Sequence, residues 1–229
     1  MKWFARRVVI ALAASSLNCD FVWAEADAGL SSVVQAGLAV PAEPGLKITL
    51  RIHNHAHVEP ETLIRAEQEA TRIYRKIGVE TVWLHQPLPK EEKQEDSPRH
   101  QRPDMDLNIL AHAMAEGLGV QSSSLGVAPG VGPKRDWAYV FYDRVEDLSR
   151  RQIVATSQGK VHRWATTAQI LGHAMAHEVG HLLGLSHSRT GIMREGWRWN
   201  DLLDAAYGDL DFTASQAVVI RTQVRIRDH

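Results

Sequence analysis

The sequence predicts a single domain of the α/β (α+β) class, in which helices pack against one mixed, twisted sheet. Four short segments have the apolar pattern of strands: residues 46–52, 79–84, 107–110 and 137–142. Three segments are expected to be helical: residues 60–77, residues 167–183 and a last segment that begins near Thr213. Strands and helices in this order form layers, with the apolar faces of the helices buried against the sheet.

The first strand and the first helix have the clearest local signals. Apolar and polar residues alternate over residues 46–52, as in a strand with one buried face. Pro60 stands at the position that proline favours at the start of a helix. Apolar residues then recur with a helical period as far as Ile77, and Gly78 is the residue type that commonly ends a helix.

The two later helices are recognised by residues that cap their first turns. Thr166 or Thr167 can accept a hydrogen bond from the backbone at the start of a helix that runs to about Leu183. Thr213 and Gln216 have the spacing of a capping box, which predicts that the last helix begins there.

Composition places the chain among soluble globular proteins. Of the 229 residues, 44% are hydrophobic and 23% are charged, which suits one domain. The formal net charge of −1 argues against a broad cationic surface, so we expect no nucleic-acid partner. Two stretches are expected to be loops. Residues 88–104 are rich in charged residues and proline, and residues 117–136 are rich in glycine and serine.

The N-terminal segment has the pattern of an export signal. Basic residues come first: Lys2, Arg6 and Arg7. An apolar run over residues 8–17 follows, and Ala24 offers a small residue for cleavage, so we expect a signal peptide at residues 1–24. The alternative is a retained anchor, but the run is too short to span a bilayer as a mature helix. These features predict a secreted or periplasmic protein with no stable membrane span after cleavage.

Two further expectations concern the region around this signal. The only cysteine, Cys19, lies inside residues 1–24, so cleavage would leave a chain without thiols or disulfides. Residues 25–45 are rich in alanine, glycine and serine and are expected to be a flexible lead-in or a short pro-segment. The folded domain is therefore predicted to cover residues 46–229.

Residues 177–187 carry the side chains of a metal site at a helical spacing. His177 and His181 are four residues apart, so on a helix both imidazoles lie on one face, where they suit a zinc ion. Glu178 points to the side of that face, where its carboxylate can accept a proton. Gly184 can take a positive φ, end the helix and let His187 supply a third nitrogen. Three protein ligands leave one position open, as in catalytic zinc sites.

The pattern from His177 to His187, followed by Met193 in a Thr-Gly-Ile-Met turn, resembles the metzincin signature. It is most similar to short secreted bacterial metzincin-like proteases that carry Gly-Ile-Met-Arg and a nearby tryptophan. The resemblance implies a zincin-like domain with a mixed sheet, an HExxH helix, a Met-turn and a C-terminal helix. It also implies a zinc metalloendopeptidase with one catalytic Zn²⁺, acting on peptides or proteins, and a substrate-pairing edge strand within residues 125–142.

The hypothesis for the mechanism follows from the same residues. Zinc held by His177, His181 and His187 would lower the pKa of a water molecule toward about 7. Glu178 would take the proton of this water as a general base and pass it to the leaving amine.

The segment after Met193 departs from the family. Many metzincins have a tyrosine just after this methionine, whereas Arg194 and Glu195 stand here, so no tyrosine ligand is expected. Trp197 and Tyr207 are candidates for the substrate pocket; the alternative is that they pack against the C-terminal helix. A thiol-based latency, known in the family, would be absent once Cys19 is removed with the signal.

Other histidines are weaker candidates. His173 is also four residues from His177, but it is out of register with the turn glycine and is expected to be a packed or solvent-facing residue. His53, His55 and His57 alternate on the polar face of the first strand, where a solvated face is preferred over a second metal site.

Two other function classes remain open. One is an exported zinc-binding protein without proteolytic activity. The other is a metal-dependent hydrolase of another substrate class, such as RNA-processing proteins that share the spacing of the three histidines. Glu178, the export signal and the lack of basic charge favour a peptidase over an RNA-processing protein. The open fourth coordination position favours a peptidase over a protein that only binds zinc. The sequence defines no oligomeric state.

Overall fold

A five-stranded sheet with the order β2-β1-β3-β5-β4 organises the fold. The structure is a computed structural model that describes residues 45–85, 105–111, 114, 124–128, 136–154 and 164–227, all within a unit formed by residues 42–229. The expected signal at residues 1–24, nearly all of the lead-in at residues 25–45 and the loop at residues 88–104 lie outside the described residues. In the part that is described, no helix is long and apolar enough to cross a membrane.

The sheet is mixed, as predicted. Its strands are β1 (Leu46–Asn54), β2 (Val79–His85), β3 (Met105–Leu110), β4 (Gly126–Val127) and β5 (Trp137–Phe141). β1 pairs in parallel with β2 and β3, and β3 pairs in parallel with β5. β4 pairs with β5 in the antiparallel direction and is the last strand in the order. One antiparallel edge strand is thus added to a parallel sheet.

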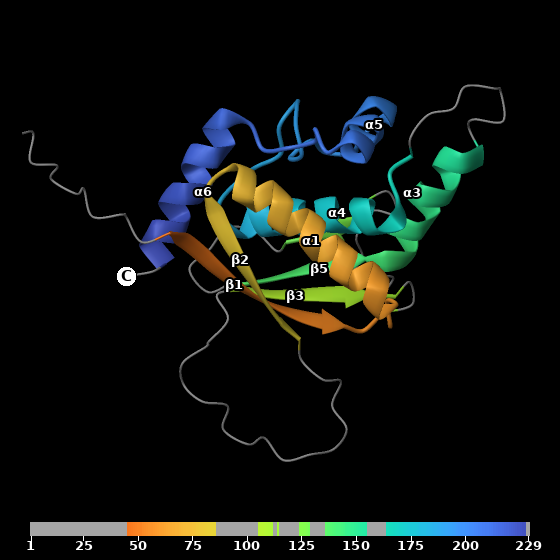
Figure 1. The fold of residues 1–229 in the computed structure, drawn as a ribbon, viewed down its shortest axis with the longest axis horizontal. Coiled ribbons are helices and arrows are strands. Elements are labelled where there is room, and N and C mark those ends of the chain that lie inside the picture. The colour runs from red at the N-terminus through yellow and green to blue at the C-terminus, as the bar shows by residue number, and fades with distance from the viewer. Residues whose placement is uncertain are drawn as a thin grey trace, which may run out of the picture. The chain divides into compact units, whose positions relative to one another are not determined.

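The helices are α1 (Pro60–Lys76), α3 (Tyr142–Val154), α4 (Thr167–Leu182), α5 (Trp199–Tyr207) and α6 (Ala214–Arg227). Figure 1 shows α1 and α4 over the same face of the sheet. The two helices cross with their backbones in contact, since a Cβ atom at Gly172 of α4 would lie 2.5 Å from the Ala66 carbonyl oxygen of α1. The Tyr74 hydroxyl of α1 also donates to the Ala176 carbonyl at 3.0 Å.

Helix α4 is the central helix, and this position explains its composition. Every residue from 170 to 180 is buried, including His173, His177 and Glu178. A helix that is apolar on all sides is one that is enclosed on all sides. The polar side chains of α4 therefore have to find partners inside the protein, or bind a ligand there.

The capping signals and turn glycines predicted from sequence are confirmed. The Thr166 hydroxyl accepts from the Gln169 backbone N–H at 3.2 Å, while the Gln169 side chain accepts from the Thr166 N–H at 3.0 Å. Gln216 accepts in the same way from the Thr213 backbone N–H at 2.9 Å. Gly78 has a φ of +75° at the end of α1.

Four details differ from the prediction. Tyr142 begins α3 rather than ending a strand, and the loop expected at residues 117–136 contains β4. α3 and α5 were not predicted. β1 ends at Asn54, so the prediction that three histidines alternate on one strand face is wrong for His55 and His57. His53 does lie on β1, and its ring bonds to the Asp106 carboxylate (Nε2–Oδ1 2.8 Å).

Candidate metal centre

Three histidine side chains converge where α4 ends. The Nε2 atoms of His177 and His181, one turn apart on α4, are 3.0 Å from each other. The chain turns at Gly184, whose φ is +86°, and returns His187 so that its Nε2 lies 3.2 Å from that of His181. Among the described residues these three histidines are the one group placed to hold a metal ion. The glycine thus has the conformation that its sequence position predicted.

Backbone carbonyls fix the orientation of the two helical histidines. The Nδ1–H of His177 donates to the Ile192 carbonyl, and that of His181 donates to the Leu185 carbonyl, each at 2.7 Å. With Nδ1 protonated in both neutral rings, each Nε2 atom carries an unshared electron pair. The lone pairs of two Nε2 atoms 3.0 Å apart repel each other unless a cation or a proton lies between them.

A metal ion fits this arrangement better than a proton. Burial lowers the pKa of His177 to about 4 and also lowers the pKa of His181, so protonation is disfavoured at neutral pH. Nitrogen ligands 2.0–2.1 Å from a tetrahedral ion lie about 3.3 Å apart, close to the separations of 3.0 and 3.2 Å seen here. The residues therefore have both the chemistry and the spacing of a metal site.

The turn that contains Ile192 and Met193 packs against α4 and supports His177. Ile192 and Met193 are fully buried, and a Cβ atom at Gly180 of α4 would lie 2.8 Å from the Met193 sulfur. The Ile192 carbonyl accepts two hydrogen bonds, one from His177 and one from the Trp197 indole N–H at 3.0 Å. This turn thereby ties the position of the first histidine to that of the following segment.

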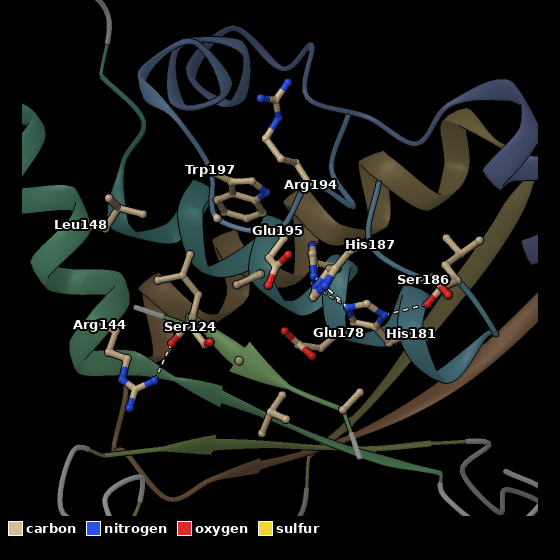
Figure 2. A pocket seen from close by; sticks show the side chains of 18 of the residues that line it. Ser124, Arg144, Leu148, Glu178, His181, Ser186, His187, Arg194, Glu195 and Trp197 are labelled. Atoms are coloured by element: carbon tan, nitrogen blue, oxygen red, sulfur yellow. Dashed lines mark hydrogen bonds between the residues drawn. The ribbon is translucent and has the colours of Figure 1, made fainter. Parts of the chain in front are cut away.

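The Glu178 carboxyl is enclosed between α4 and the edge strand. Glu178 is 5% exposed, and burial raises its pKa to about 8 because the charged form loses its hydration. A Cβ atom at Gly126 of β4 would come within 2.6 Å of Oε1, while Oε2 has no hydrogen-bond partner within the described part of the chain. Figure 2 shows the carboxylate in the cleft, close to His181 and His187.

The histidines and Glu178 open onto a cleft of about 630 Å³. Its walls come from the segment 124–128 that contains β4, from α3 and α4, and from residues 194–197 after the Met-turn. Trp197 and Glu195 line the cleft beside the histidines (Figure 2). Arg194 also lines the cleft and forms an ion pair with Asp201 (Nε–Oδ1 3.4 Å).

The other candidate residues differ in their position relative to the cleft. His173 is fully buried, with Nδ1–H donating to the Gln169 carbonyl at 2.8 Å, which agrees with a packed residue. Tyr207 lies on α5, is 59% exposed and is not among the residues that line the cleft, whereas Trp197 is. Trp199 packs against Trp164, with ring centroids 5.1 Å apart.

Sequence reasoning missed Gly126 and the cleft-lining arginines of α3, Arg144 and Arg151. A helical period over residues 142–154 was the signal available for the arginines. Gly126 offered none, because its contact with Glu178 joins two segments that are distant in the chain.

No protein-family model and no curated protein matches this chain. Among solved structures it is similar to a zinc-dependent peptidase from Methanocorpusculum labreanum (strain Z), with 14% sequence identity and a TM-score of 0.42. The similarity covers 75% of this chain and 99% of that one.

Proposed function

We propose that this protein is an exported, metzincin-like zinc endopeptidase that hydrolyses peptide bonds in the cleft beside α4. The observation that carries the proposal is the placement of three converging imidazole nitrogens and one buried carboxyl, Glu178, on the same cleft. The three nitrogens are arranged to hold a cation, and the carboxyl is arranged to move a proton.

Zinc is the metal that suits this donor set. Neutral imidazoles are borderline-soft ligands, and three of them leave a coordination position open for a reactant. Bound by His177, His181 and His187, zinc would supply Lewis acidity toward a peptide carbonyl and toward a water molecule.

Glu178 would act as the proton carrier. Its pKa of about 8 favours the neutral form at neutral pH, and a divalent cation close by favours the carboxylate, so the two effects oppose each other. A carboxyl whose pKa lies near the working pH can both accept and release a proton. Glu178 would accept a proton from water and deliver it to the nitrogen of the leaving amine. Because Oε2 has no partner among the described residues, it is available for this exchange.

Strand β4 would hold the substrate. It is the last strand of the sheet, so one of its edges has no neighbouring strand in the described part of the chain, and both of its residues line the cleft. An extended peptide can add to such an edge through backbone hydrogen bonds. Since Gly126 touches Glu178, a peptide bound along β4 would pass directly in front of the catalytic carboxyl.

The deciding experiment compares the zinc-loaded protein with its Glu178→Gln variant on casein and on a quenched peptide library. We expect cleavage that stops with a chelator and returns with zinc. Glu178→Gln should bind zinc with the wild-type stoichiometry yet cleave about 10²–10⁴-fold more slowly, the range typical of a lost general base. The control is Glu61→Gln, since the Glu61 side chain is 79% exposed on α1.

Each other result has a definite meaning. Cleavage by Glu178→Gln at the wild-type rate would remove the role assigned to that residue. Stoichiometric zinc without cleavage of any peptide would leave a zinc-binding protein, or a hydrolase of another substrate class. Purification of the native protein from the culture medium or the periplasm, with the N-terminus sequenced, tests the proposed export.

A further inference from the structure

The wall of the cleft formed by α3 is positively charged. Arg144 and Arg151 both line the cleft, and Leu148 lies between them. They are seven residues apart, which is about two helical turns, so they share one face of α3 and stand roughly 10 Å apart along it. Asp147 also lines this wall, but its carboxylate accepts from Arg150 at 2.5 Å, which offsets its charge.

Two neutral groups help to orient Arg144. One guanidinium N–H donates to the Ser124 carbonyl at 2.7 Å, and the guanidinium carbon lies 4.3 Å from the centre of the Phe141 ring. Figure 2 shows Arg144 beside Ser124, at the end of the cleft away from the histidines. Burial also lowers the pKa of Arg144, because its charge is partly removed from water. An oriented and partly dehydrated guanidinium is well suited to pair with a carboxylate.

The remaining charged groups of the cleft lie elsewhere. Arg194 forms an ion pair with Asp201. Glu178 and Glu195 lie near the histidines (Figure 2). The arginines of α3 therefore lie at the end of the cleft away from the metal centre, and the two glutamates lie beside that centre.

The position of β4 indicates which part of a bound peptide would lie near the arginines of α3. Gly126 touches Glu178. In the proposed peptidase the scissile bond would therefore lie opposite Gly126. Ser124 and Arg144 lie on the N-terminal side of β4. Antiparallel pairing is the more stable arrangement for an added strand, and a peptide paired in that way runs opposite to β4. Its residues after the scissile bond would then lie toward Ser124 and the α3 wall.

We propose that Arg144 and Arg151 make this cleft selective for a carboxylate on the C-terminal side of the scissile bond. The inference rests on the proposed peptidase function. The carboxylate can belong to an aspartate or glutamate side chain of the substrate or to its free C-terminus. Leu148 and Trp197 supply the apolar surface for the rest of that residue.

The test separates binding from cleavage. The zinc-loaded Glu178→Gln variant is titrated calorimetrically with C-terminally amidated alanine peptides that differ at one position: Asp, Asn, Leu or Lys. A shorter leucine peptide that ends in a free carboxylate forms the second arm. We expect the Asp peptide to bind at least about tenfold more tightly than the Asn peptide, with Lys the weakest. The free-carboxylate arm shows whether a C-terminus serves as well as a side chain.

Matched variants assign the preference to the arginines. Arg151→Gln should reduce the preference of Asp over Asn to within about threefold, and Arg151→Glu should invert the order of the Asp and Lys peptides. Arg144→Gln should act like Arg151→Gln, but it also removes the bond to Ser124, so Arg151 is the cleaner probe. Arg75→Gln removes the same charge from an exposed position on α1 and should leave the preference unchanged.

The outcomes distinguish this inference from the proposed function. Binding without a carboxylate preference, a preference that survives in both arginine variants, or no binding of any peptide would overturn the inference. Wild-type enzyme that cuts peptides before Leu or Lys as well as before Asp would also overturn it. A carboxylate preference that depends on the arginines, in a protein that cleaves no peptide, would overturn the peptidase function and leave the selectivity in place.

Discussion

The backbone of Gly126 lies directly against the carboxyl of Glu178. A Cβ atom at residue 126 would come within 2.6 Å of Glu178 Oε1 and within 2.6 Å of the Tyr139 carbonyl oxygen. The contact joins the edge strand to the helix that carries the histidines, so the absence of a side chain at this glycine sets the distance between the proposed substrate strand and the proposed general base.

Gly126→Ala should therefore reduce cleavage and spare metal binding. The new methyl group cannot be accommodated against the Tyr139 backbone, so Glu178 or β4 has to move, and displacements of about 1 Å can cost about 10²-fold in rate. We expect a loss of that order in kcat/KM, with zinc stoichiometry and affinity unchanged. Gly45→Ala is the control, because its Cβ atom would meet only Glu80 Oε1, at 4.0 Å. A Gly126→Ala enzyme with wild-type kcat/KM would show that the contact is irrelevant to catalysis.

Gly180→Ala should destabilise the fold through Met193. A Cβ atom at residue 180 would lie 2.8 Å from the Met193 sulfur and 3.2 Å from the Phe212 ring, and overpacking of this kind costs about 1–3 kcal/mol. Met193→Ala alone should cost about 2–5 kcal/mol of unfolding free energy, as for other buried methionines. In the double variant the added methyl group enters the space left by Met193. The loss of unfolding free energy in the double variant should therefore be smaller than the sum of the losses in the two single variants. Urea denaturation of the four proteins measures this coupling, and simple additivity would exclude it.

Buried His173 should make the protein less stable at low pH. Burial lowers its pKa below the ordinary value of 6.5, so the folded state favours the neutral ring. The unfolded chain then binds more protons as the pH falls below about 6.5. The neutral His173 ring makes its full contribution to the free energy of unfolding above this pH. As the pH drops toward the folded-state pKa, this contribution falls by at most about 1.4 kcal/mol per pH unit.

His173→Asn isolates this effect. The asparagine amide can still donate to the Gln169 carbonyl but does not titrate. The difference in unfolding free energy between wild type and variant should be constant above pH 6.5 and should shrink in acid, because only the wild type has a titrating ring at this position. Parallel stability profiles for the two proteins from pH 7 to pH 5 would contradict the assignment.

Metal removal should lower stability by an amount set by mass action. A ligand that binds only the folded state at about 100 times its Kd adds about 2.7 kcal/mol. His187 is exposed, so His187→Ala should cost the metal-free protein less than about 0.5 kcal/mol while removing most of the stabilisation by zinc. Thermal unfolding with and without zinc, for wild type and variant, gives both quantities. Equal stabilisation of the two proteins by zinc would exclude His187 as a ligand.

The elements that could be predicted from sequence are those with local causes. Thr166 and Gln169 cap each other within one turn, and the positive φ of Gly184 follows from its place after the helix. The three histidines are brought together by a helical spacing and one turn, and both can be recognised in the sequence of residues 177–187. α3 follows β5 directly, without a turn residue between them, so Tyr142 reads as part of the strand. α5 has Arg198 at its start instead of a common capping residue.

The parts that could not be predicted depend on contacts between distant segments. The contact of Gly126 with Glu178 and the location of Arg144 beside the cleft arise only when β4, β5 and α3 are arranged around α4. Tyr207 is the converse case, a residue that was predicted to line the pocket and does not. Its closeness in sequence to the Met-turn suggested a role in the pocket, but α5 turns its side chain to solvent.

The three histidines and Glu178 differ in how much of the chain has to fold before they reach their positions in the site. Residues 177–187 need only one helical turn and one bend to bring the imidazoles together, so the entropy lost in closing that short loop is small. Glu178 meets Gly126 across 52 residues of chain, and this contact forms only when the sheet edge has docked. In the proposed enzyme, metal binding and competence for cleavage would therefore be separable events in folding. If the protein has the proposed function, a newly folding chain would bind zinc before it could cleave other proteins, including neighbouring copies of itself.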